Sequence, residues 1–341
     1  MSGSQAILGV DAGGTKTDAL VVDRHGAVLA FVRGRGANHE AIGWVRAQEQ
    51  LRSTVVQALE MAEAAPESIA ASGWGLAGLD WPSDEIRHRS IIADLGFPDP
   101  ALVVNDAFLA LTARPDDEPG IAVVSGTGVV VVGRTARGTT TRTLGVGAGR
   151  GDWGSGGQIA FAAAKAIAAQ HMGLGPKTAL TELALQRSGV TSVDAYCQQV
   201  WRQRRTSLLP PDVWQVAASG DAVAAGIADR VADSLAAGAG AVASRLDLHE
   251  PDVVLTGRVL DPGHPLLHDR LVAELAAVVP GCRPRRLGVP PVVGAIRAAA
   301  RSLGWNTTGL PDLRRELVPR ERDTPRSSEH VEPTSAASPD A

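Results

Sequence analysis

The first hundred residues alternate short apolar runs with turn-forming segments. Apolar runs at 7–10, 19–22 and 28–31 are separated by glycine- and aspartate-containing turns, which predicts three strands. Residues 41–64 instead repeat apolar side chains at three- and four-residue spacing before Pro66, which predicts an amphipathic helix. Its expected buried stripe contains Ile42, Val45, Leu51, Val55, Leu59 and Ala62.

Two further apolar runs, at 72–79 and 101–104, have the composition of buried strands. The second leads directly into Asn105 and Asp106, and a helix-compatible segment starts near Ala107. Asp106 is therefore expected at the carboxyl end of a strand, where α/β folds place functional groups.

The same order of elements begins again after the proline- and acid-rich segment 115–119. Apolar runs at 121–125 and 129–132 flank a glycine-rich turn, and a third strand is expected at 139–144. Helices are expected near 155–171, 178–188, 192–204, 221–246, 264–279 and 292–303, with one more strand at 253–256. The recurrence predicts a duplicated α/β lobe.

The boundaries follow from this repeat. We expect an N-terminal lobe at 1–118, completed by a C-terminal helix at 291–305, and a second lobe at 119–290. We expect a disordered tail at 306–341, because the chain beyond Pro319 is rich in Pro, Ser, Glu and Arg and nearly lacks apolar side chains.

Composition narrows the functional classes. The chain has 341 residues, 44% of them hydrophobic and 21% charged, which fits a two-domain globular protein. A net charge of −4 with scattered arginines argues against a nucleic-acid partner. The two cysteines, Cys197 and Cys282, are too few for a disulfide framework, a cysteine-based zinc site or an all-cysteine iron–sulfur cluster. No signal peptide or apolar run of about 20 residues is present, so we expect no membrane partner and a cytoplasmic location.

Two glycine-rich turns are candidate phosphate sites. Asp11, Gly13, Gly14, Thr15 and Lys16 occupy the first turn, where adjacent glycines let backbone amides approach an anion. The turn matches neither the P-loop nor the Rossmann pattern, and a plain hairpin is the alternative. The second turn contains Gly126, Thr127 and Gly128 after Ser125. One such turn in each lobe favours nucleotide binding.

For two residues and one segment, the sequence alone allows two roles each. Asp106 can be a catalytic base or a helix N-cap. Lys16 can contact a phosphate or be a solvated turn residue. The glycine-rich segment 145–157 can bind a ligand or act as a lid or hinge.

The ordered set of motifs resembles the N-acetylglucosamine kinases of the BadF/BadG/BcrA/BcrD ATPase family. The resemblance covers about 6–303 and rests on the order of the motifs at 11–17, 37–39, 75–80, 105–107, 125–128, 145–155 and 253–257. It implies two ribonuclease-H-like (actin-like ATPase) lobes with a central cleft. It also implies ATP-dependent phosphorylation of the 6-hydroxyl of an amino sugar, N-acetylglucosamine or a related hexosamine.

The resemblance also implies a role for each matching residue. Gly13, Gly14, Thr15, Lys16, Gly126, Thr127, Gly128 and Gly257 would contact ATP, and Asp11 would orient Mg²⁺ through water. Asn38, His39, Gly145, Val146, Gly147 and Asp152 would line the sugar site, and Asp106 would be the base. A homodimer is common among such kinases.

Four positions depart from the family pattern, and they concern both substrates. Trp153 stands where glutamate is usual, and Val146 where tryptophan is frequent. The resemblance therefore predicts phosphoryl transfer to a sugar more firmly than it predicts which sugar is the acceptor. Val129 and Arg258 replace small residues on the nucleotide side.

Three alternatives compete with the kinase interpretation. An ATPase activator of the same family would need an interfacial cysteine motif, and a zinc-containing repressor would need a cysteine-rich segment; neither Cys197 nor Cys282 lies in one. A non-catalytic nucleotide- or sugar-binding protein of the same fold is the third.

Overall fold

The computed structural model describes residues 5–97, 99–114, 118–147, 151–260 and 265–306. The chain divides into two compact units: the first combines Met1–Asp117 with Gly288–Ala341, and the second is Glu118–Leu287. The tail expected at 306–341 lies outside the described residues except for Asn306.

The first unit is built on a five-stranded mixed sheet. Its strands are β1 (Ala6–Ala12), β2 (Lys16–Asp23), β3 (Val28–Arg35), β4 (Ile69–Leu76) and β5 (Leu102–Val104). The order across the sheet is β3-β2-β1-β4-β5. Antiparallel pairing joins β1, β2 and β3, whereas β1, β4 and β5 run parallel, so β1 and β5 end at the same edge.

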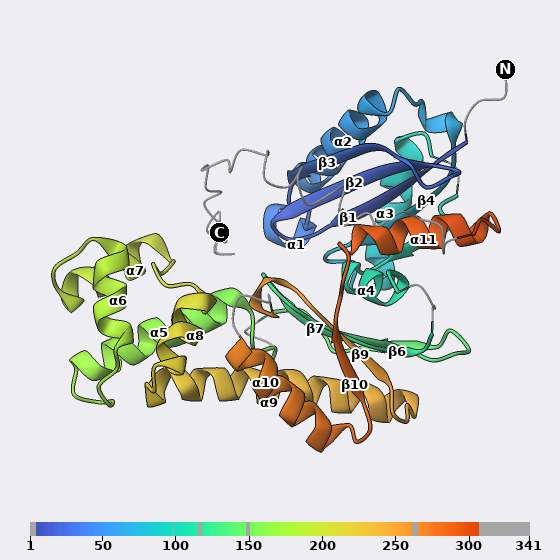
Figure 1. Cartoon of the computed structure of the whole chain (residues 1–341). Helices are drawn as coiled ribbons and strands as arrows, with labels where there is room; N and C mark the ends of the chain where they lie inside the picture. The colour runs from blue at the N-terminus through green and yellow to red at the C-terminus, as the bar shows by residue number, and fades with distance from the viewer. Residues whose placement is uncertain (1–4, 98, 115–117, 148–150, 261–264, 307–341) are drawn as a thin grey trace, which may run out of the picture. The chain divides into compact units, whose positions relative to one another are not determined.

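Helices cover both faces of this sheet (Figure 1). Alternate residues of β1 divide between the faces: Leu8 and Val10 pack with residues of α2 (Trp44–Met61) and α3 (Pro82–Asp94). Ile7 packs with α11 (Val292–Ser302) on the other face. The short helices of this unit are α1 (His39–Ile42), η1 (Pro66–Ser68), η2 (Asp106–Phe108) and α4 (Leu109–Thr112). The alternation is that of a strand buried on both sides.

Glycines let α11 approach the sheet and α4 closely. A Cβ at Gly73 of β4 would lie 2.4 Å from the carbonyl oxygen of Ala295, and one at Gly294 would lie 2.2 Å from that of Leu109. Because no larger residue fits, α11 holds both β4 and the helix that follows Asp106. The C-terminal segment thus supports the region of Asp106.

The second unit repeats the same topology. Its strands are β6 (Gly120–Ser125), β7 (Val129–Arg134), β8 (Thr140–Arg142), β9 (Asp252–Thr256) and β10 (Arg283–Arg286). Their order, β10-β9-β6-β7-β8, has antiparallel pairing of β6, β7 and β8 and parallel pairing of β6, β9 and β10. The duplicated ribonuclease-H-like lobe is confirmed by the two matching sheets.

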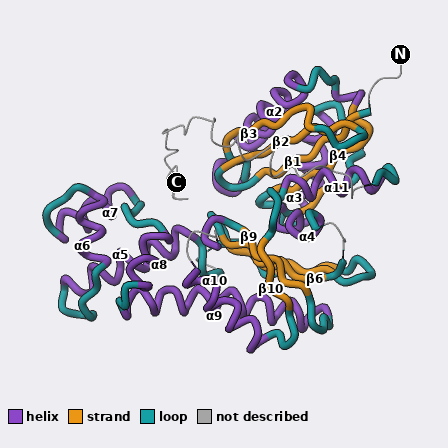
Figure 2. Tube along the Cα trace, in the orientation of Figure 1, coloured by secondary structure: helices purple, strands orange, loops and turns teal. Residues whose placement is uncertain are grey.

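Helices form the rest of the second unit. The long α9 (Ala222–Leu246) packs against α10 (Pro265–Val278) and contacts β6 and β7. Four more helices form an adjoining helical group (Figures 1 and 2). These are α5 (Gly156–His171), α6 (Leu180–Ser188), α7 (Val193–Gln203) and α8 (Pro210–Ala218); η4 (Arg258–Leu260) follows β9. None of the helices within the described ranges is long and apolar enough to cross a membrane.

Most predicted elements are confirmed, and the differences have local causes. Val45 was expected on the buried stripe of its helix but is 70% exposed. Gly43, with a φ of 77°, separates α1 from α2, so Val45 lies in the first turn of α2, ahead of its buried residues. The sequence reasoning also missed α3, α8 and the arginine-rich edge strand β10.

Candidate functional site

The β1–β2 turn is held in one conformation by its own backbone and by the segment after β3. The Gly13 amide donates to the Lys16 carbonyl oxygen at 2.8 Å, and the Ala37 amide donates to the Gly13 carbonyl oxygen at 3.1 Å. A Cβ at Gly36 would lie 2.3 Å from the Gly14 carbonyl oxygen, so Gly36 packs directly on the turn. The turn is therefore more constrained than a plain hairpin.

The tip of this turn is available to a ligand. Gly14 and Thr15 are exposed, and their amides donate no hydrogen bond to any part of the chain that the structure describes. Free amides on a fixed, glycine-rich backbone are suited to anionic oxygens. The turn fits a phosphate group.

Below the turn, charged side chains form an ion-pair network. Arg33 donates from Nε and Nη2 to the buried Asp18 at 2.6 and 2.8 Å, and Lys16 also bonds Asp18. Burial alone would raise the pKa of Asp18, but the bonds from Arg33 and the charge of Lys16 outweigh it and hold the pKa below its usual value. Lys16 Nζ also lies 3.8 Å from Asp11 Oδ2. Lys16 is thus directed into the network and is not a freely solvated lysine.

Asp106 stands beside the turn and is not the helix cap. Asn105 Oδ1 accepts the Ala107 amide at 3.1 Å, so Asn105 is the N-cap of η2. The Asn105 amide nitrogen donates to Asp80 Oδ1 at 3.0 Å. A Cβ at Gly13 would lie 3.9 Å from Asp106 Oδ2, which places the Asp106 carboxylate next to the turn. Its surface is partly exposed.

The carboxylates of this region have perturbed acidities. Burial, then the charge of Asp11 and to a smaller extent that of Asp80, raises the pKa of Asp106 to about 7. Burial also raises the pKa of Asp11 to about 6, even though Lys16 opposes it. A group with a pKa near neutrality can take up and release a proton at physiological pH.

Asn38 and His39 have different surroundings, although they are neighbours in sequence. Asn38 Oδ1 caps α1 by accepting the Glu40 amide at 2.9 Å, and Asn38 is partly exposed. His39 is buried, with its ring stacked on Trp44 at 3.7 Å and 5.5 Å from the ring of His88. Burial lowers the pKa of His39. The structure thus leaves Asn38 accessible and encloses His39.

The β6–β7 turn of the second unit is fixed by three segments. Ser125 Oγ donates to the Gly154 carbonyl oxygen at 2.7 Å, and the Gly156 amide donates to that of Gly126 at 2.8 Å. Gly257 has a φ of 104°, and a Cβ there would lie 2.0 Å from the Ser125 carbonyl oxygen. The turn, the start of α5 and Gly257 therefore form one packed group. Thr127 and Gly128 at its tip are exposed.

Two residues of the segment expected to bind the sugar are joined by a hydrogen bond from a backbone amide to a side chain. The Gly147 amide donates to Asp152 Oδ2 at 2.7 Å, and Gly145 and Gly147 have φ values of 68° and 97°. Val146 and Asp152 are partly buried. Because 148–150 lie outside the described residues, a lid or hinge role for the segment 145–157 stays a prediction.

Two of the four departures from the family pattern border the second glycine turn. Val129 begins β7, and Arg258 follows Gly257 with an exposed side chain. A Cβ at Gly126 would lie 3.8 Å from the Arg258 backbone nitrogen, so Arg258 borders the second turn.

The structure adds residues that the sequence reasoning did not assign. Asp18 and Arg33 stabilise the first turn from below, and Asp80 holds Asn105. Asp18 lies on β2 and its partner Arg33 on β3, and the spacing of the two residues in the sequence does not indicate their contact. Asp80 lies in the motif at 75–80, but no role was predicted for it.

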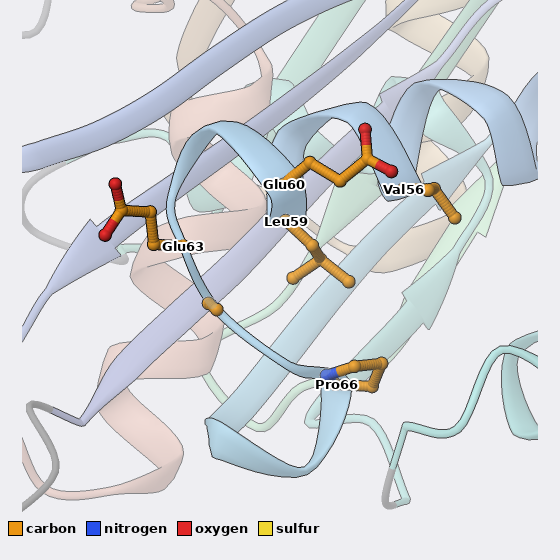
Figure 3. A pocket seen from close by; sticks show the side chains of 6 residues that line it. Val56, Leu59, Glu60, Glu63 and Pro66 are labelled. Carbon is orange, nitrogen blue, oxygen red and sulfur yellow. The ribbon is translucent and has the colours of Figure 1, made fainter.

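Two surface pockets of the described residues are lined by other side chains. The one in Figure 3 has a volume of about 270 Å³ and is lined by Val56, Leu59, Glu60, Glu63, Ala64 and Pro66. Another, of about 500 Å³, is lined by residues of α6 and α8 and by the segment Ser219, Gly220 and Asp221 that precedes α9. Neither contains a predicted site residue. Among the described residues, no group of three or more His, Cys, Asp and Glu side chains could hold a metal, so a cation at Asp11 would need water or ligand oxygens.

Comparisons with known proteins define the class. The sequence model of the BadF/BadG/BcrA/BcrD ATPase family matches residues 8–297, and the chain belongs to this family.

Curated relatives carry kinase names. The chain is 29% identical over 254 residues to an N-acetylmuramic acid/N-acetylglucosamine kinase of Clostridium acetobutylicum, covering 73% of this chain and 83% of the relative. It is 25% identical over 233 residues to an N-acetyl-D-glucosamine kinase of Dictyostelium discoideum, covering 64% and 73%. A solved structure of a candidate N-acetylglucosamine kinase from Chromobacterium violaceum has a TM-score of 0.66 at 24% identity, over 87% of this chain and 99% of the other. That structure supports the fold.

Proposed function

We propose that the protein phosphorylates the 6-hydroxyl of an amino sugar, N-acetylglucosamine or a related hexosamine, with ATP as phosphoryl donor. Family membership and the names of the two curated relatives support this activity. The observation that carries the site is Asp106, a partly exposed carboxylate with a pKa of about 7 beside a fixed glycine turn. Asn105 is the N-cap of η2, so the Asp106 carboxylate is not required for capping and can act as a base.

In this proposal the two glycine turns hold the nucleotide. The free amides of Gly14 and Thr15 bind phosphate oxygens, and Gly13 and Lys16 keep the turn in shape. Gly126, Thr127 and Gly128 give further phosphate contacts, and Gly257 borders the adenosine. Glycine is required at 257, since any side chain would collide with Ser125.

Asp11 is the residue proposed to hold Mg²⁺ through water. Its buried carboxylate adds negative charge near Asp106, and burial raises its pKa, so a cation there would relieve an unfavourable charge. The bound ion would supply charge neutralisation for the phosphate groups.

Asp106 is proposed to accept the proton of the sugar hydroxyl as that oxygen attacks the phosphoryl group. Asn105 and Asp80 fix the start of η2 and so orient the carboxylate. Phosphoryl transfer depends chiefly on such positioning and on charge, with the base contributing roughly 10²- to 10⁴-fold.

The sugar is proposed to contact Asn38, the backbone of Gly145, Val146 and Gly147, and Asp152. Asp152 already accepts the Gly147 amide with one oxygen, which fixes its carboxylate. His39 is proposed to act by supporting Asn38, because its ring is stacked on Trp44 and buried. The homodimer and the cytoplasmic location stay predictions.

A coupled assay of ADP release tests the proposal. We expect release to depend on Mg²⁺ and on an amino sugar when N-acetylglucosamine, glucosamine and glucose are compared. Asp106→Asn should lower kcat by at least about 10²-fold while ATP binding is retained. Asp94→Asn, at an exposed carboxylate of the same unit, is the matched control and should leave kcat unchanged.

Two outcomes would contradict the proposal. Sugar-independent ADP release would favour an ATPase activator, and binding of ATP or sugar without turnover would favour a non-catalytic binding protein. Retained turnover in Asp106→Asn would remove the base assignment alone.

A further inference from the structure

The segment 78–81, between β4 and α3, contacts residues on two sides of the candidate site. Gly78 has a φ of 79°, and a Cβ there would lie 2.7 Å from Asn38 Oδ1, so its backbone packs directly against the Asn38 side chain. Two residues further on, Asp80 Oδ1 accepts a hydrogen bond from Asn105 Nδ2 at 3.0 Å. One short segment therefore contacts both a residue assigned to the sugar and the cap that precedes the proposed base.

The side chain of Asp84 holds this segment from the first turn of α3. Asp84 is buried, and its Oδ2 accepts the amides of Asp80 and Trp81 at 3.2 and 2.9 Å. Capping of α3 requires only the bond from Trp81, which is the N-cap residue. The Asp80 amide also donates to the Gly78 carbonyl oxygen at 2.9 Å. Asp84 is thus joined to the part of the segment that contacts Asn38 and Asn105.

The second oxygen of Asp84 faces the histidine that follows Asn38. Asp84 Oδ1 lies 3.8 Å from His39 Nε2, and the His39 ring is stacked on Trp44. A carboxylate is buried at a high cost unless polar groups surround its oxygens, and Asp84 divides its two oxygens between the segment and His39. Asp84 therefore acts on Asn38 by two routes, through the backbone of Gly78 and through the adjacent His39.

We propose that Asp84 is a positioning residue for the acceptor sugar, which holds Asn38 in a fixed place relative to the Asp106 carboxylate. The inference rests on the proposed function and adds a residue to it. Displacement of a bound reactant by about 1 Å can cost about 10²-fold in rate, so a residue that only holds Asn38 can affect turnover strongly. The β1–β2 turn assigned to ATP is held by its own backbone bonds, so ATP binding should not depend on Asp84.

The test compares Asp84→Ala and Asp84→Asn with the wild type. Asp84→Ala removes both contacts, whereas Asp84→Asn keeps an acceptor oxygen for the two amides and replaces the oxygen that faces His39. We expect Asp84→Ala to raise KM for N-acetylglucosamine and to lower kcat/KM by about 10- to 100-fold. Asp84→Asn should lose less, and the Kd of ATP should stay within about two-fold in both variants.

A second capping aspartate is the matched control. Asp212 is buried at the equivalent position of α8, in the second unit, where its Oδ2 accepts the Leu209 amide at 2.9 Å. Asp212→Ala should lower the free energy of unfolding as Asp84→Ala does, but it should leave KM for the sugar unchanged. Gly78→Ala tests the same route with Asp84 intact: its methyl group would meet Asn38 Oδ1, so KM for the sugar should rise while ATP binding is kept.

Sugar binding is measured by calorimetry in parallel, so that the result does not depend on turnover. If the wild type binds N-acetylglucosamine without phosphorylating it, the proposed function fails, while weaker binding in Asp84→Ala still supports the inference. An unchanged KM for the sugar in folded Asp84→Ala, an equal loss of sugar and ATP binding, or a raised KM in Asp212→Ala would overturn the inference alone. Absence of sugar binding in the wild type would overturn both. Thermal unfolding checks that each variant is folded, and if Asp84→Ala is not, Asp84→Asn and Gly78→Ala decide.

Discussion

Asn105 donates its side-chain amide to Asp80 at 3.0 Å while its oxygen caps the turn that begins at Asp106. Asn105 thus satisfies the free backbone amide at the start of η2, and Asp106 is not needed as the cap. The Asp106 carboxylate is left beside the β1–β2 turn with two neighbouring acidic groups, which is costly for the folded state and useful for a base.

Asp106→Asn should therefore stabilise the free protein at neutral and alkaline pH. The pKa of Asp106 is raised to about 7 in the folded state, so this state binds more protons than the unfolded chain between about pH 4 and 7, and the ionised group destabilises it above that window. Because the side chain is partly exposed, we expect a gain of about 1–2 kcal/mol at pH 8 and none at pH 4. Urea unfolding at both pH values measures it. A loss of stability would mean that Asp106 has a structural role, as a cap would.

The pH profile of the kinase should reflect the charge of Asp80. A base must be deprotonated, so kcat/KM should fall on the acid side as Asp106 takes up its proton. Because the Asp80 charge contributes to the raised pKa of Asp106, Asp80→Asn should move this acid limb to lower pH. Rates from pH 5 to 9 in the wild type, Asp80→Asn and the exposed-site control Asp94→Asn decide it. A shift to higher pH, or an equal shift in the control, would contradict the assignment.

His88 should make the first unit sensitive to acid. Its ring is buried beside Trp44 and His39, and neither ring nitrogen has a partner among the described residues. Burial, followed by the neighbouring His39, lowers the pKa of His88 to about 4. The folded state thus binds fewer protons than the unfolded chain between about pH 6.5 and 4, and the stability present above pH 6.5 is lost as pH falls through that window.

Replacing the ring by a neutral one tests this acid sensitivity. The lowering of the His88 pKa corresponds to a free energy of roughly 3 kcal/mol. Between pH 7 and 4, the free energy of unfolding should therefore fall less in His88→Phe than in the wild type, by up to about this amount. His25→Asn, at an exposed histidine, should unfold with the pH dependence of the wild type. If His88→Phe and the wild type had parallel stability curves, His88 would not be the group that titrates.

The sequence predicted the sheets well because their strands are continuous apolar runs with glycine or proline at the ends. It failed where buried positions are polar or charged: α3 buries Asp84 and His88 together with only two isoleucines, and β10 consists of arginines and a proline. For the site, periodicity placed Asp106 at a strand end but could not distinguish base from cap, because Asn105 and Asp106 are both good caps. The bond that identifies Asn105 as the cap, from the Ala107 amide, is local, but the contact that holds the Asn105 side chain joins it to Asp80, which is distant in sequence.

Gly257→Ala should disrupt the second glycine turn. The new methyl group would meet the Ser125 carbonyl oxygen at 2.0 Å, and the φ of 104° already disfavours any residue with a Cβ. The backbone of Ser125 cannot retreat freely, because its side chain is bonded to Gly154 and Gly126 is bonded to Gly156. We expect a loss of at least about 2 kcal/mol in urea unfolding and a clear weakening of ATP binding by calorimetry. Gly226→Ala, at an exposed position in α9 with open space around it, is the matched control and should stabilise the protein by up to about 1 kcal/mol. Normal ATP binding in a folded Gly257→Ala variant would show that the nucleotide does not depend on this turn.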